Sequence, residues 1–150
     1  MTQFEGDREV PLAAAAVFQK LSDARFLVEC VPDVESVGQS QPDMAVCIIR
    51  PGFAFVRGSL ELTLNVAEAV ADSSVRLLLH TKGIGSTSDV EATLTLTTKE
   101  GATRIHWVVE LKTLGGLLKA VPQGLIKAAA QKVIADVWTA VEGRLRERSS

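Results

Sequence analysis

The last third of the sequence, residues 115–148, reads GGLLKAVPQGLIKAAAQKVIADVWTAVEGRLRER and decides what kind of fold the chain can form. Apolar residues recur in it every three or four positions, as on the buried face of a long amphipathic helix. Pro122 and Gly124 interrupt its start, so we expect a kink, or a short first turn before a main helix that begins at Pro122. The helix should cover roughly 115–146. Its expected apolar stripe consists of Leu118, Val121, Leu125, Ala129, Val133, Val137, Val141 and Leu145.

Upstream of this helix the apolar pattern changes to a period of two residues. Candidate strands are 34–40, 43–50, 53–67, 74–82, 88–98 and 103–113, separated by short turns rich in Gly, Pro, Asp and Ser. Such short connections favour antiparallel neighbours over helical crossovers. The alternation also predicts a sheet with one apolar face and one wet face.

The first third adds one more strand and two short helices. Residues 2–10 alternate weakly, which indicates a strand. Helices are expected near 11–21 and 23–30, because Pro11 suits a first helical turn and Ser22 or Asp23 can cap the second helix. No repeat, linker or low-complexity segment interrupts the pattern, so residues 1–150 are expected to form a single α+β domain.

Composition narrows the classes of function. The formal net charge is −2, so there is no basic excess of the kind that nucleic-acid binding requires. No apolar run approaches the roughly 20 residues of a transmembrane helix, and MTQFEGDREVP lacks the pattern of a signal peptide. A cytoplasmic protein is therefore expected. Cys30 and Cys47 form no CxxC motif and are expected to be buried free thiols.

Residues 50–58, RPGFAFVRG, raise the question whether the apolar sheet face is closed. Gly58 is expected to allow a bulge or bend in the strand. If the sheet curves around the helix, the two apolar surfaces can enclose a site for a small apolar ligand, although each residue could equally belong to an ordinary core. The predicted ligand-binding residues are Phe53, Phe55, Leu62, Leu77, Leu79, Ile105, Trp107 and Val109 of the sheet and Leu118, Val121, Leu125 and Ala129 of the helix.

Polar candidates for chemistry have no motif support. His80 and His106 are expected to face away from the cavity, and neither lies at a spacing typical of a metal site or an acid–base pair. Residues 83–86 and 115–116 complete no phosphate-binding motif, and no GxSxG elbow exists. The sequence therefore predicts no catalytic residue, no metal and no cofactor.

Two basic features have a plain and a sharper interpretation. Arg50 and Arg57 are expected to be solvated, with binding of a ligand head group at the cavity mouth as the alternative. The basic residues of 144–148 complement the dipole at the helix C-terminus, with a weak attraction to anionic lipid as the alternative.

The predicted element order has one economical solution, in which a curved antiparallel sheet of about seven strands wraps around the long helix and two short helices close one end. Four stretches, FEGDREVPLAAAAVFQKLSD, CVPDVESV, FVRGSLEL and HWVVELKTLGGLLKAVPQGLI, carry a resemblance that spans nearly the whole chain. The sequence resembles the CoxG-like family of carbon monoxide dehydrogenase subunits, which has the helix-grip fold of the START-like or Bet v 1-like (SRPBCC) superfamily.

The resemblance implies a non-enzymatic protein that binds a lipid or an isoprenoid quinone and has a protein partner in a molybdenum hydroxylase system of the carbon monoxide dehydrogenase type. Longer members of the family continue into a membrane-anchoring segment, whereas this sequence ends at RLRERSS, so at most a weak peripheral membrane contact is expected. Two alternatives remain open: a polyketide cyclase or aromatase-like enzyme, which needs polar groups in the cavity, and a protein–protein interaction module. The oligomeric state is not predicted.

Overall fold

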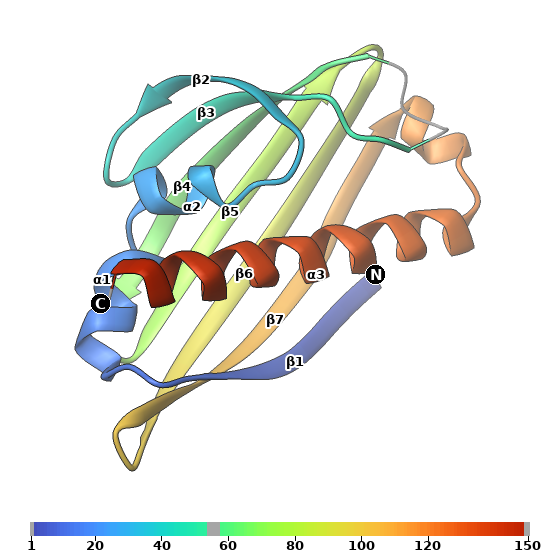
Figure 1. The fold of residues 1–150 in the computed structure, drawn as a ribbon. Helices are drawn as coiled ribbons and strands as arrows, with labels where there is room; N and C mark the ends of the chain where they lie inside the picture. The colour runs from blue at the N-terminus through green and yellow to red at the C-terminus, as the bar shows by residue number, and fades with distance from the viewer. Residues whose placement is uncertain (1, 54–57, 149–150) are drawn as a thin grey trace.

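The computed structural model describes residues 2–53 and 58–148, with side chains up to Arg146 (Figure 1). In chain order the elements are β1 (Thr2–Val10), α1 (Ala14–Leu21), α2 (Ala24–Glu29), β2 (Val34–Ser40), β3 (Met44–Ile49), β4 (Leu60–Val70), β5 (Ser74–Gly83), β6 (Ser86–Lys99), β7 (Ala102–Gly116), the 3-10 helix η1 (Leu117–Ala120) and α3 (Gln123–Arg148).

One antiparallel sheet of seven strands forms the body of the molecule, in the order β1-β7-β6-β5-β4-β3-β2. The sheet curves, and α3 crosses its concave face, while α1 and α2 lie beside the C-terminal end of α3 (Figure 1). The 26 residues of α3 span about 39 Å. The expected arrangement of a curved sheet around a long helix, with two short helices after the first strand, is confirmed.

Local sequence explains the sharp turns of this sheet. Ile84 and Gly85 connect β5 to β6 with φ values of 46° and 72°, and Glu100 and Gly101 connect β6 to β7 with 43° and 83°. Two successive residues in the left-handed region match the twist of a hairpin, and glycine adopts that region without a steric penalty. These turns let β5, β6 and β7 run as long neighbouring strands.

The α2 cap is also where the sequence predicts it. Asp23 accepts a hydrogen bond from the backbone N–H of Arg25 at 2.9 Å, which satisfies a donor at the helix start. The Arg25 guanidinium returns to the same carboxylate at 2.7 Å, and this hydrogen bond lowers the pKa of Asp23. The first helix begins at Ala14, three residues after Pro11.

The strand expected over 53–67 begins only at Leu60. Phe53, Gly58 and Ser59 lie outside any strand, because Pro51 has no N–H to donate and Gly58 has a φ of 129°. Phe55 and Arg57 lie outside the described residues. The bulge expected at Gly58 is absent from that position, and the described strands carry bulges at Ala67 in β4 and at Lys112 in β7 instead.

The apolar stripe of the long helix is shifted from the predicted one at its start. The short first turn exists as η1, but Val121 is then extended, with a ψ of 132°, and α3 begins at Gln123. The phase of Leu118 and Val121 therefore does not continue into α3. Leu125 is 52% exposed, and the neighbouring Ile126 faces the sheet instead.

The hydrophobic core lies at one end of the molecule. There α1, α2 and the C-terminal half of α3 pack against the sheet, and their side chains are almost completely buried. The main contributors from the helices are Val17, Leu21, Phe26, Leu27, Trp138, Val141 and Leu145. The opposite end of the molecule, where η1 meets the start of α3, lacks such a packed cluster among the described residues.

Candidate ligand cavity

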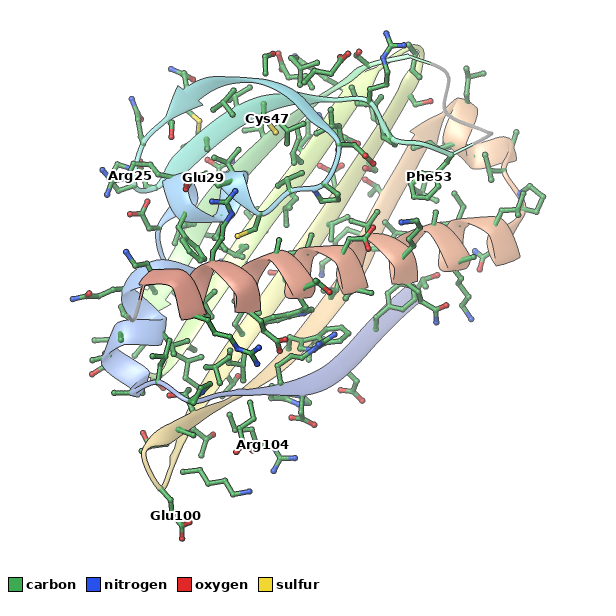
Figure 2. All side chains as sticks on the ribbon, in the orientation of Figure 1. Arg25, Glu29, Cys47, Phe53, Glu100 and Arg104 are labelled. Carbon is green, nitrogen blue, oxygen red and sulfur yellow. The ribbon has the colours of Figure 1, made fainter. Side chains whose placement is uncertain are left out.

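A cavity of about 350 Å³ lies between α3 and the concave face of the sheet. Every described strand except β2 contributes to its wall, together with α1, α2, η1 and α3. Pockets of this size, lined mostly by apolar side chains, are typical of small-molecule sites. Figure 2 shows the labelled Phe53 at the η1 end of the molecule, between the segment that follows β3 and the helix α3.

Eight of the twelve predicted ligand-binding residues lie on the cavity wall: Phe53, Leu62, Leu77, Leu79, Trp107, Val109, Leu118 and Ala129. They come from four strands or their flanks and from two helices, so the fold brings together residues that are far apart in sequence. Phe55 lies outside the described residues.

The other three predicted residues lie elsewhere. Ile105 is fully buried in the core, because β7 continues past the cavity toward the packed end of the sheet. Val121 sits in the extended link between η1 and α3, and Leu125 lies on the solvent side of α3. Neither of these two belongs to the wall.

Several wall residues were missed by sequence reasoning, and most are small or on α3. Ala92 and Ala130 have short side chains that leave the space open, and Ile126, Ile134 and Trp138 form the true inner face of the helix. The inward parity of Ala92 was visible in the alternation of β6. The phase of α3 was not, because it depends on where the helix begins.

Both tryptophans of the chain lie on the wall. The ring centroids of Trp107 and Trp138 are 6.3 Å apart, at an interplanar angle of 36°, a separation at which aromatic rings attract each other. Gly6 lies opposite Trp107 in β1, and a Cβ atom there would approach the Trp107 ring to 2.7 Å. The indole of Trp107 can therefore lie across β1 only because residue 6 has no side chain.

The cavity wall contains very few polar atoms. Thr81 and Ser88 are paired across β5 and β6, with their hydroxyl oxygens 2.5 Å apart, and the only carboxylate among the described lining residues is that of Asp33. No lysine, arginine or histidine belongs to the described lining. The site is thus suited to holding an apolar molecule rather than to binding an ion.

Each histidine has a carboxylate partner that the sequence spacing did not reveal. His80 Nδ1 lies 2.7 Å from Asp89 Oδ1, and His106 Nδ1 lies 3.0 Å from Asp7 Oδ1. In both pairs the two residues are directly opposite on neighbouring strands, so only the register shows the contact. A hydrogen bond from the Thr113 hydroxyl, and then the one with His80, lower the pKa of Asp89.

Neither histidine pair belongs to the cavity wall. Both pairs are partly exposed, and such surface contacts are common between sheet neighbours. Within residues 2–53 and 58–148, no group of three or more histidine, cysteine or acidic side chains could hold a metal ion.

The remaining candidates have structural explanations. Arg50 forms an ion pair with Glu35 at 3.3 Å, on an exposed part of the surface. Cys30 and Cys47 are free and buried, and burial raises the pKa of the Cys47 thiol. In the part of the chain that the structure describes, no helix is both long and apolar enough to span a bilayer.

Comparison with solved structures identifies the fold. A conserved protein from Geobacillus kaustophilus matches with a TM-score of 0.84 and 20% identity, over 97% of this chain and 96% of that one. A START superfamily protein from Mycobacterium smegmatis matches with a TM-score of 0.67 and 14% identity, over 97% of each chain. The protein Ara h 8.0201 matches with a TM-score of 0.65 and 13% identity, over 97% of this chain and 98% of that one. The fold is thus the START-like or Bet v 1-like helix grip.

Comparison of the sequence alone gives a narrower result. No curated protein sequence matches this chain significantly. The family model for CoxG, the G-type subunit of carbon monoxide dehydrogenase, matches residues 6–146, which include the strands, the helices and the cavity wall between them. The chain therefore belongs to the CoxG family of carbon monoxide dehydrogenase subunits.

Proposed function

We propose that this protein binds an apolar small molecule in the cavity between the sheet and α3 and has no catalytic activity of its own. The observation that carries the proposal is the cavity itself, with a volume of about 350 Å³ and a wall made almost entirely of apolar side chains. A void of this kind destabilises a folded protein unless something fills it, because its lining atoms lose dispersion contacts. A ligand that fills the space supplies those contacts.

The ligand class that fits is a lipid or an isoprenoid quinone. Membership of the CoxG family supports an accessory role near a molybdenum hydroxylase of the carbon monoxide dehydrogenase type, with that enzyme as the protein partner. A cytoplasmic location with peripheral membrane contact would let the protein exchange such a ligand with a bilayer. The predicted wall residues, Phe53, Leu62, Leu77, Leu79, Trp107, Val109, Leu118 and Ala129, are the ones we assign to ligand contact.

The direct test is to identify what the protein carries and whether it can be replaced. Organic extraction of purified protein, followed by mass spectrometry, should yield a stoichiometric apolar compound. Adding that compound, or a short-chain isoprenoid quinone, to the extracted protein should change the fluorescence of Trp107 and Trp138, since both line the cavity. An empty extract together with unchanged fluorescence would contradict the proposal.

The enzyme alternative, a polyketide cyclase or aromatase-like activity, would have to operate with Asp33, Thr81 and Ser88, the oxygen-bearing side chains of the described wall. Turnover of an added polyketide by the purified protein would support it.

A second candidate function, docking to a protein partner, is favoured by exposed apolar side chains at the η1 end of the molecule. Leu117 is 66% exposed and Ile84 is 40% exposed. The two lie close together, because the N–H of Leu117 donates to the carbonyl of Gly85 at 2.9 Å. If this surface binds the hydroxylase, Leu117→Ser should abolish co-purification of the enzyme without changing ligand content. An unchanged complex would exclude this surface as the docking site.

A further inference from the structure

The cavity has one polar position in an otherwise apolar wall, and that position lies inside the sheet rather than in a loop. Thr81 follows Leu77 and Leu79 along the concave side of β5, and Ser88 precedes Val90 and Ala92 along the concave side of β6. The alternation of inward residues is thus apolar on both strands until the two hydroxyl residues, which are register partners.

The surroundings isolate these two hydroxyl groups. Leu62 is the β4 neighbour of Thr81, and Leu114 is the β7 neighbour of Ser88. The bulge at Lys112 reverses the parity of β7, so that Leu111 and Leu114 both reach the cavity wall. Within the described residues, the two hydroxyl groups have hydrogen bonds only to each other.

A hydroxyl pair of this kind keeps unused hydrogen-bonding capacity. Each hydroxyl group has one proton and two lone pairs. When one donates to the other across the 2.5 Å between Thr81 Oγ1 and Ser88 Oγ, one proton and several lone pairs stay available to a third group. A ligand with one polar head in an apolar body can satisfy them, whereas a pure hydrocarbon leaves them without a partner.

The charge of the wall decides which heads are accepted. Asp33 is the only charged residue in the described lining, and its carboxylate repels an anionic head. Lys132 is close enough to interact with the charge of Asp33, but its ammonium group lies 2.7 Å from Asp136 and is largely exposed. An anionic head would therefore lose its hydration without gaining a cation.

We infer that the ligand is a neutral amphiphile with a single hydrogen-bonding head, such as a carbonyl, ether or hydroxyl group, and that Thr81 and Ser88 receive that head. The inference rests on the proposed function and specifies its ligand. The tail lies along the concave face toward Trp107 and Trp138. From Ser88 to Leu94, which is the register partner of Trp107, β6 covers about 20 Å, so an extended tail has room beside these strands.

The experiment uses three probes that share a ten-carbon chain: decane without a head, decanol with a neutral head and decanoate with an anionic head. Binding is followed by the fluorescence of the two tryptophans, and each probe is compared with itself between proteins, which cancels its solubility. The test protein carries Thr81→Val and Ser88→Ala together. Thr95→Val is the matched control, since Thr95 is an exposed residue of β6 outside the cavity wall.

The double variant should bind decanol about tenfold more weakly than the wild type, as expected for the loss of one or two neutral hydrogen bonds. Its affinity for decane should stay the same or rise slightly, and Thr95→Val should change neither. In the wild type at pH 8, decanoate should bind at least tenfold more weakly than decanol, and Asp33→Asn should recover part of that loss.

Equal loss of decane and decanol binding in the double variant would overturn the inference, because it would indicate a general change of the cavity. Unchanged decanol binding, or decanoate binding as tight as decanol binding, would overturn it as well. If the wild type binds none of the three probes, the proposed function itself fails. These outcomes separate the head-group assignment from the existence of the ligand site.

Discussion

The two halves of α3 belong to the same continuous helix but meet the sheet in different ways. In the C-terminal half, Trp138, Val141 and Leu145 are almost fully buried against the core formed with α1 and α2. In the N-terminal half, Ile126, Ala130 and Ile134 face the sheet only across the cavity and remain partly exposed. Figure 1 shows α1 and α2 beside the C-terminal half alone.

This difference separates stability from binding along a single element. The packed end supplies the close apolar contacts that hold the helix on the sheet. The hollow end combines short side chains, such as Ala92, Ala129 and Ala130, with a helix start that is preceded by the extended Val121. A binding site can occupy that end because the fold does not depend on filling it.

The largest expected effect comes from removing the same kind of side chain from each half. Leu145→Ala should lower the free energy of unfolding by about 2–5 kcal/mol, because it opens a void in a packed core. Ile126→Ala should cost about 1 kcal/mol or less, because the removed atoms already face open space. Urea denaturation of both variants measures the two losses, and similar values would mean that both halves are packed alike.

Enlarging an alanine sharpens the same comparison on the sheet. Ala45 of β3 is completely buried in the core, whereas Ala92 of β6 lies on the cavity wall. Ala45→Leu should destabilise the protein by about 1–3 kcal/mol, as overpacking does. Ala92→Leu should cost less than about 1 kcal/mol, because the new atoms enter the cavity. Thermal unfolding of the pair would refute a real void if Ala92→Leu proved as damaging as Ala45→Leu.

A glycine marks the boundary between the packed and hollow regions. Gly6→Ala should cost about 1–2 kcal/mol, because the new Cβ would collide with the Trp107 ring. The displaced indole should also shift the tryptophan emission spectrum.

The control for this change is Gly38→Ala, whose nearest neighbour would be the Val46 carbonyl oxygen at 3.5 Å, an ordinary contact. That variant should keep the wild-type emission spectrum. An unchanged spectrum in Gly6→Ala would show that Trp107 is not held against β1.

The smallest expected effect again compares the halves of α3. Gly143 and Gly124 both have open space around the position of a Cβ. Gly143→Ala should raise the free energy of unfolding by about 0.5–1 kcal/mol, since alanine favours a helix interior. Gly124→Ala should give a smaller gain, because residue 124 lies in the first turn, where helices fray. A larger gain at Gly124 than at Gly143 would contradict this ranking of the two halves.

The architecture could be predicted from sequence because it depends on patterns that single residues do not disturb. Period-two alternation, short turns and a long apolar stripe each repeat over many positions, so the errors were limited to element ends. The strand expected from Phe53 failed at Pro51 and Gly58, where the competing turn chemistry was stronger than the alternation of the two phenylalanines.

The site was predicted less completely, because its residues depend on phase and register. A start at Gln123 turns Leu125 outward and Ile126 inward, although both are apolar. The bulge at Lys112 brings Leu114 onto the wall, against simple alternation. The carboxylate partners of His80 and His106 come from neighbouring strands, so no spacing along the chain could reveal them.

The central claim is that the space under the N-terminal half of α3 binds an apolar ligand. The most direct measurement is the free energy of unfolding of wild type and Ala92→Leu as decanol is added. A ligand that binds only the folded state should stabilise the wild type by about 2.7 kcal/mol at one hundred times its Kd. The stabilisation should be much smaller in Ala92→Leu, whose new side chain occupies the cavity. Equal stabilisation of both proteins, or none in the wild type, would contradict the claim.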